Sequence, residues 1–170
     1  MSGVKEAYAA HRSLVYQLSL RYAAGRSDWA EDLAHDVFVK LIEHYAQLNT
    51  DDDLAGWLYR VTANLALSRL RGERARIRRL MLSFSGQAEE FDDSASDLFD
   101  RRQQASEVMQ VMQNLPTKER VVLCMKVLDG KSQTEIATIL SMSEGYVSKL
   151  LARAWEHVRQ AGWEVSDEPS

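Results

Sequence analysis

The chain has 170 residues, of which 45% are hydrophobic and 27% charged, and its formal net charge is -4 at pH 7. No apolar run approaches the roughly 18 residues that span a bilayer, and the first residues, MSGVKEAYAAHRSL, lack the apolar core of a signal peptide. A single cysteine, Cys124, excludes an internal disulfide. We therefore expect a cytoplasmic protein of one domain or two small ones.

The charges are distributed unevenly along the chain. Residues 69–79, RLRGERARIRR, hold six arginines and one glutamate, whereas residues 83–100, SFSGQAEEFDDSASDLFD, hold six acids and no base. Nucleic-acid binding depends on such local fields and not on the net charge. The acidic segment lacks helical periodicity, which indicates a linker. We place this acidic linker at residues 81–103, between domains at 1–80 and 104–170.

Apolar residues recur at helical spacing on both sides of the linker, and the chain has only two prolines and eight glycines. These patterns predict an all-α protein of two small helical domains. The N-terminal stripes are Leu14, Val15, Leu18 and Tyr22; then Leu33, Val37, Leu41 and Ile42; and, after N-cap candidates in NTDDD, Trp57, Leu58, Val61 and Leu65. In the C-terminal half, Val108, Val111, Met112 and Leu115 form another stripe, and KERVVLCMKVLDG reads as a helix closed by Gly130.

Residues 132–154, SQTEIATILSMSEGYVSKLLARA, have the pattern of a DNA-binding helix-turn-helix. Ser132 and Glu135 form a capping box at the start of the first helix, and Ser143 caps the second. The small side chain of Ala137 leaves room for two helices to cross closely. Ser141 stands where such turns usually have a glycine. An ordinary helical hairpin is the alternative interpretation.

The second helix of this pair would expose Tyr146, Ser148, Lys149 and Arg153 on one face. Arginine and lysine bind guanine edges or phosphates, serine binds either, and tyrosine suits a phosphate or a thymine methyl group. Two or three cations neutralise few phosphates, so we expect this module to bind DNA weakly when it acts alone.

A second candidate nucleic-acid surface lies on the helix expected after residue 53. Opposite its buried stripe, one face carries Arg60, Asn64, Ser68 and Arg71, and the arginine cluster follows. These side chains suit contacts to the nucleic-acid backbone and the reading of unstacked bases. A salt-bridged surface helix explains the same pattern equally well.

Three stretches, in this order, resemble the extracytoplasmic-function sigma factors of bacterial RNA polymerase. EDLAHDVFVKLIEH, residues 31–44, is similar to the core-binding helix D-x-x-Q-[DE]-x-F of that family, with His35 in place of the glutamine. GWLYRVTANLALSRLR, residues 56–71, is similar to the helix W-L-x-x-I-A-x-N-x-x-x-D-x-x-R that binds the -10 promoter element, with Thr62 and Ser68 in place of alanine and aspartate. Residues 115–154 are similar to the domain that binds the -35 element, with Leu150 where an arginine is common.

The resemblance implies a division of tasks between the two domains. The residues that would bind the clamp helices of core RNA polymerase are Asp32, His35, Asp36 and Phe38. Those that would hold the melted -10 element are Arg60, Asn64, Ser68 and Arg71, and those that would read the -35 duplex are Tyr146, Ser148, Lys149 and Arg153. The acidic linker would run through the polymerase toward its active site and RNA-exit channel. The implied partners of a chain that is monomeric when free are core RNA polymerase, promoter DNA and an anti-sigma factor.

Two other classes of function compete with this interpretation. A stand-alone helix-turn-helix regulator would share residues 132–154, but such proteins normally dimerise, and no zipper is evident. An enzyme would need a catalytic or metal-binding constellation, whereas the four histidines are scattered at positions 11, 35, 44 and 157 without ligand spacing. We therefore expect neither catalysis nor a metal or other cofactor.

Overall fold

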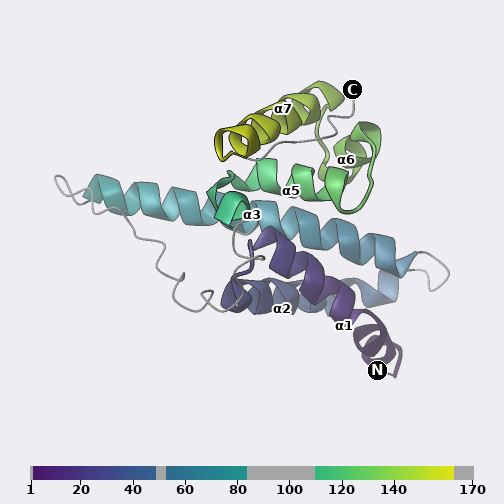
Figure 1. Cartoon of the computed structure of the whole chain (residues 1–170). Coiled ribbons are helices and arrows are strands. Elements are labelled where there is room, and N and C mark those ends of the chain that lie inside the picture. The colour runs from purple at the N-terminus through teal and green to yellow at the C-terminus, as the bar shows by residue number, and fades with distance from the viewer. Residues whose placement is uncertain (1, 49–52, 84–109, 163–170) are drawn as a thin grey trace.

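The computed structural model describes residues 2–48, 53–83 and 110–162, and the regular secondary structure within these ranges is helical (Figure 1). The helices are α1 (Ser2–Tyr22), α2 (Ser27–His44), the short 3-10 helix η1 (Tyr45–Gln47), α3 (Leu54–Ser83), α5 (Thr117–Val127), α6 (Gln133–Leu140) and α7 (Glu144–Gln160). The predicted all-α fold is confirmed. None of the helices in the described ranges is long and apolar enough to cross a membrane.

Helix α3 runs through the middle of the molecule, with α1 and α2 on one side and α5, α6 and α7 on the other (Figure 1). Its first turn is capped by Asp53, whose Oδ1 accepts a hydrogen bond of 3.0 Å from the Gly56 amide. Its N-terminal half packs against α1 and α2. The fully buried residues of this N-terminal core are Val15, Val37, Leu41 and Leu58.

The C-terminal part of α3 extends away from α1 and α2 and ends at Ser83 (Figure 1). The helix therefore includes residues 81–83, where the sequence predicted the start of the acidic linker. The remaining linker positions, 84–103, lie outside the described residues.

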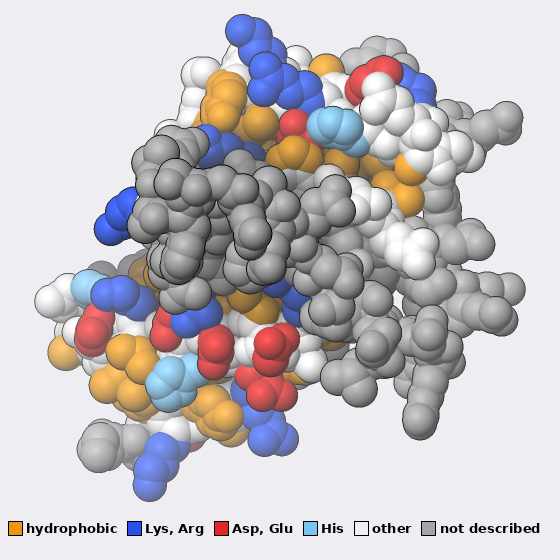
Figure 2. Space-filling model, turned by 90° about the vertical axis from the view of Figure 1, so that its left-hand side faces the viewer, with side chains coloured by type: hydrophobic (Ala, Val, Ile, Leu, Met, Phe, Trp, Pro, Cys, Tyr) orange, Lys and Arg blue, Asp and Glu red, His pale blue; other side chains and the backbone are white. Residues whose placement is uncertain are grey.

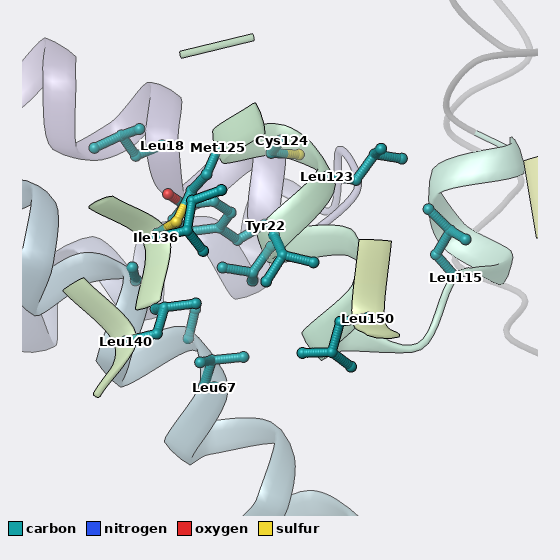
Figure 3. Packing of buried hydrophobic residues seen from close by; sticks show 14 of the residues in the cluster. Leu18, Tyr22, Leu67, Leu115, Leu123, Cys124, Met125, Ile136, Leu140 and Leu150 are labelled. Carbon is teal, nitrogen blue, oxygen red and sulfur yellow. The ribbon is translucent and has the colours of Figure 1, made fainter. Parts of the chain in front are cut away.

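A second core joins the N-terminal helices to the C-terminal ones. Apolar side chains of α1 and α3 interdigitate there with those of α5, α6 and α7, so the two sets of helices pack directly on each other. Figure 3 shows Tyr22, Met125 and Ile136 close together in this shared core. Its buried members include Leu18, Tyr22, Leu67, Val122, Met125, Ile136, Leu140 and Leu150.

Arg120 ties the same two sets of helices together by hydrogen bonds. Only 6% of this residue is exposed, and its Nη1 donates to the Tyr22 carbonyl at the end of α1 over 2.8 Å. Its Nη2 donates to the Leu115 carbonyl over 3.0 Å, within the C-terminal part. A buried guanidinium needs such acceptors because an unsatisfied charge in the interior is strongly unfavourable.

Truncation of the shared core should destabilise the whole chain. We expect Ile136→Ala to lower the free energy of unfolding by about 2–5 kcal/mol, because it removes buried methylene groups and leaves a cavity. Val127→Ala is the matched control, since Val127 on α5 is 54% exposed, and it should change the free energy of unfolding by about 0.5 kcal/mol or less. Urea titration followed by circular dichroism measures both. An Ile136→Ala variant as stable as the control would contradict the shared core.

Candidate nucleic-acid interface

Helices α6 and α7 form the predicted helix-turn-helix, and local hydrogen bonds set its boundaries. The Ser132 hydroxyl accepts from the Glu135 amide at 3.1 Å, and the Glu135 carboxylate accepts from the Ser132 amide at 2.7 Å. The Ser132 amide, which donates to the Glu135 carboxylate, is the main cause that lowers the pKa of Glu135, and the Ser132 side chain adds to the effect. The Ser143 hydroxyl accepts from the Tyr146 amide at 3.2 Å. Both predicted caps are thus present, including the complete capping box.

The turn between α6 and α7 places Ser141 in the left-handed region, with φ 53° and ψ 46°. The Met142 amide donates to the Ala137 carbonyl at 2.9 Å and the Ser141 amide to the Thr138 carbonyl at 3.4 Å, which is the bonding pattern of a Schellman motif. This conformation explains why a glycine is usual here: a side chain with a Cβ is strained at positive φ.

Helix α7 buries one face and exposes another. Val147, Leu150, Leu151 and Ala154 are buried against α5 and α6. Ser148, Lys149 and Arg153, which the sequence analysis assigned to DNA, are all exposed to solvent. In Figure 2, Lys and Arg side chains gather at the top of the molecule, over the C-terminal helices. These three side chains are therefore free of burial within the described part of the chain.

Tyr146 belongs to the same predicted set but is half-buried and has an intramolecular partner. Its hydroxyl accepts a hydrogen bond from the Lys118 Nζ at 3.2 Å, and that nitrogen lies 5.4 Å from the centre of the tyrosine ring. Lys118 was missed in the sequence analysis. The available signal was a cation in the first turn of α5, the helix that comes before the helix-turn-helix pair and packs against α7.

The predicted -10 face of α3 is exposed at Arg60, Asn64 and Ser68. These positions are four residues apart and therefore follow one stripe of the helix. The side chain of Arg71, the fourth predicted member, lies outside the described residues. Asn64 is engaged within the protein, because its Nδ2 donates to the Arg60 carbonyl at 2.9 Å and to the Ile139 carbonyl of α6 at 3.0 Å. The -10 face and the first helix of the helix-turn-helix are therefore in direct contact.

The third predicted surface lies on α2. Asp32 and His35 are exposed, and Phe38 packs edge-to-face on Tyr8, with ring centroids 4.7 Å apart. Asp36 is already paired, since its Oδ2 accepts from the Arg69 Nη2 at 2.6 Å and from Nε at 2.9 Å. The acidic pattern alone did not reveal this ion pair between α2 and α3.

A groove of about 500 Å³ lies between α1 and α2 beside Phe38. His35 and Phe38 line it, but Asp32 and Asp36 do not. On its other side, α1 lines the groove with Tyr8, Arg12 and Tyr16, which the sequence analysis did not select. In Figure 2, acidic and apolar side chains lie side by side on the lower, N-terminal part of the molecule.

Within the described ranges, no group of three or more His, Cys, Asp or Glu side chains is placed to hold a metal ion. Cys124 is buried, and burial raises the pKa of its thiol to about 12. The thiol is therefore protonated at neutral pH, which makes it a weak nucleophile.

Comparisons with known proteins match both parts of the chain. Residues 7–76 match the family model Sigma-70 region 2, and residues 105–158 match Sigma-70, region 4. The chain is 30% identical over 138 residues to the probable RNA polymerase sigma factor RfaY of Xanthomonas campestris pv. campestris, an alignment that covers 76% of this chain and 33% of that protein. It is 26% identical over 157 residues to the ECF RNA polymerase sigma factor SigW of Bacillus subtilis, with 88% of this chain and 83% of that protein covered.

The fold also matches a solved complex. The sigma factor RpoE bound to the anti-sigma factor NepR from Bartonella quintana superposes with a TM-score of 0.64 at 16% sequence identity. The match covers 95% of this chain and 97% of that chain. It therefore includes both sets of helices.

The left-handed turn residue offers a sharp test of the helix-turn-helix geometry. We expect Ser141→Gly to raise the free energy of unfolding by about 0.5–1 kcal/mol, because glycine relieves the strain of the positive φ. Part of this stabilisation is offset, because glycine loses more backbone entropy than serine when the chain folds. Ser143→Gly in the same turn, at φ -73°, removes only a side-chain cap and should lower the free energy of unfolding by a few tenths of a kcal/mol. Thermal unfolding by calorimetry measures both changes. Destabilisation by Ser141→Gly would contradict the assigned turn.

Proposed function

Because the chain belongs to the sigma-70 family, in its extracytoplasmic-function group, we propose that it is an alternative sigma factor that binds core RNA polymerase and directs promoter-specific initiation. The observation that supports this proposal is that one chain carries two exposed stripes of polar and basic side chains, each a candidate nucleic-acid face. One face is the exposed side of α7, and the other is the exposed side of α3. A stand-alone helix-turn-helix regulator needs only the face on α7.

In the proposed function, α7 enters the major groove of the -35 element. Arg153 and Lys149 donate to guanine edges or phosphates, and Ser148 donates to or accepts from a base edge. Lys118 and Tyr146 form a joint cation and hydroxyl at the start of α7, which suits one phosphate. Phosphate contacts fix the orientation of the helix, and base contacts supply the sequence preference.

The -10 element is read on α3 in this proposal. Arg60, Asn64 and Ser68 lie along one side of the helix, and Arg71 belongs to the same set by its spacing in the sequence, so an unstacked base and its backbone can be held there. Extruding a base costs a few kcal/mol, and stacking on an aromatic or guanidinium plane returns about 1–3 kcal/mol per base. Strand separation therefore needs the additional binding free energy that core polymerase provides.

Core polymerase binds α2 in this proposal, through Asp32, His35, Asp36 and Phe38. The groove between α1 and α2 extends the surface to Tyr8 and Arg12, so apolar and charged contacts are both available. The Arg69 pair orients the Asp36 carboxylate and partly neutralises it. The polymerase performs the chemistry of RNA synthesis, and this chain performs none.

An anti-sigma factor is the proposed regulatory partner. The structural relative RpoE is bound by such a protein, NepR. We place the present chain in the cytoplasm, where polymerase and promoter DNA are found.

The proposal is tested by run-off transcription with core RNA polymerase and a promoter library. Arg153→Ala should reduce transcription from promoters with the preferred -35 element about 10-fold, since a good base contact contributes about 1–3 kcal/mol of discrimination. Arg159→Ala is the matched control on the same helix, because Arg159 pairs with Glu156 at 3.2 Å. A free protein that binds promoters specifically without stimulating core polymerase would instead indicate a stand-alone regulator.

The -10 assignment has a separate test on the same promoters. Asn64→Ala should reduce discrimination among -10 sequences and leave the -35 preference unchanged, because its side chain lies on α3 and not on α7. Sequencing of the transcripts from a library with both elements randomised measures the two preferences together. Unchanged -10 preference would remove Asn64 from the proposed reading face.

A further inference from the structure

A second groove, of about 530 Å³, lies between the N-terminal and the C-terminal helices. It shares no residue with the groove beside Phe38. Its walls are α1, the first turns of α3, the turn between α5 and α6, and Ile139 of α6. Sites for small molecules typically have volumes of about 300–1,000 Å³. The groove is therefore large enough for a small ligand.

The two carboxylates that line this groove already have hydrogen-bond donors. Asp129 accepts from the Arg21 Nη1 at 2.7 Å and from the Tyr59 hydroxyl at 2.5 Å, and only 14% of its side chain is exposed. Asp53 accepts from the Gly56 amide at 3.0 Å, at the N-terminus of α3, where the helix dipole favours a negative charge. Both negative charges are therefore offset within the protein.

Two cations of the groove, Arg60 and Lys131, form no ion pair among the described residues. Lys131 is half-buried, and its Nζ lies 5.4 Å from the centre of the Tyr59 ring. Burial is the main cause of the raised pKa of Tyr59, so its hydroxyl is uncharged at neutral pH and offsets neither cation. Hydrogen bonds from Ser132 are the main causes of the lowered pKa of Glu135, to which Lys131 adds the smallest contribution. The groove therefore carries positive charge that the described side chains do not neutralise.

These charges favour a phosphate over a neutral or singly charged ligand. A phosphate monoester carries a charge of about -1.5 to -2 at neutral pH and has three strong acceptor oxygens. The guanidinium of Arg60 can bind two of these oxygens at once, and Lys131 supplies a compact second charge. Leu14, Leu18 and Ile139 line the same groove with apolar surface. The complementary ligand therefore joins a phosphate to an apolar portion.

We propose that this groove is a binding site for a small phosphorylated molecule, whose phosphate is bound by Arg60 and Lys131 and whose apolar portion lies on Leu14 and Ile139. The ligand contacts both sets of helices, so its binding free energy adds to the stability of the folded chain. The site goes beyond the proposed function and needs neither polymerase nor promoter. Arg60 is also a member of the candidate -10 face, and this overlap alone rests on the proposed function.

Isothermal titration calorimetry on the free, full-length chain tests the site. A salt concentration of about 0.15 M limits the general attraction of exposed charges, since the Debye length is then about 8 Å. Phenyl phosphate has both features of the ligand, inorganic phosphate lacks the apolar portion, and benzyl alcohol lacks the phosphate. We expect saturable one-to-one binding of phenyl phosphate, weaker binding of inorganic phosphate and no binding of benzyl alcohol. Absence of saturable phenyl phosphate binding at millimolar concentration would overturn the proposal, and equal affinities for the two phosphates would overturn its apolar half.

Substitutions locate the binding in the groove. Lys131→Gln and Arg60→Gln should each raise the Kd for phenyl phosphate about tenfold, because each removes a hydrogen bond between charged groups. Lys40→Gln is the control, since it removes the same charge from α2, where Lys40 pairs with Glu43 at 2.8 Å outside the groove. Ala55→Leu fills the groove without a change of charge and should also weaken binding. Circular dichroism shows whether each variant is folded, and a Kd equal to that of the control in Lys131→Gln and Arg60→Gln would overturn the site.

A last titration distinguishes a small ligand from the phosphates of a DNA strand. A short single-stranded DNA without terminal phosphates should bind more weakly than phenyl phosphate, because each of its phosphodiesters carries a single charge. Tighter binding of the strand, with the same loss in Lys131→Gln, would assign the groove to DNA and overturn the small-molecule proposal. No polymerase is present in these titrations, so a failure of the proposed function in run-off transcription leaves their result standing.

Discussion

The positions of both candidate reading faces depend on the core that α1 and α3 share with α5, α6 and α7. Arg120 shows how closely this core is integrated, since one guanidinium binds the end of α1 and the segment before α5. In the same core, the side chains of Tyr22, Met125 and Ile136 are fully buried. Burial of such side chains is the dominant favourable contribution to packing, so the two sets of helices need no ligand to pack on each other.

Sequence patterns predicted the features that arise within a few residues of chain. The capping box of Ser132 and Glu135 and the N-cap at Asp53 both join residues three positions apart, and the apolar stripes follow from helix geometry alone. The contacts that were missed join distant residues: Arg69 with Asp36, 33 positions apart, and Asn64 with Ile139, 75 positions apart. Charge and periodicity do not encode such partners, because they depend on how complete helices pack.

The candidate site residues also differ in whether local sequence or long-range packing sets their environment. Ser148, Lys149 and Arg153 were selected for their helical spacing, and spacing suffices to place them on the exposed side of α7. Tyr146 lies at the helix start, where neighbouring α5 reaches it through Lys118, so spacing alone could not describe its environment. Lys118 can be selected from the sequence only if the helix-turn-helix architecture is assumed first, because that architecture brings the first turns of α5 and α7 together.

In the proposed function, Asn64 links the packing of α6 on α3 to promoter affinity by simple competition. Its amide cannot donate to the Ile139 carbonyl and reach an unstacked base through the same hydrogen at once. When a ligand binds only molecules without this contact, its apparent Kd equals the intrinsic Kd divided by the fraction of such molecules. Under the proposed function, the contact between α6 and α3 therefore weakens binding to every promoter by the same factor and leaves the ranking among promoters unchanged. On that proposal, a contact that stabilises the packing of α6 on α3 sets how much of the protein can bind DNA, whereas side chains on the exposed faces of α3 and α7 set which sequences it selects.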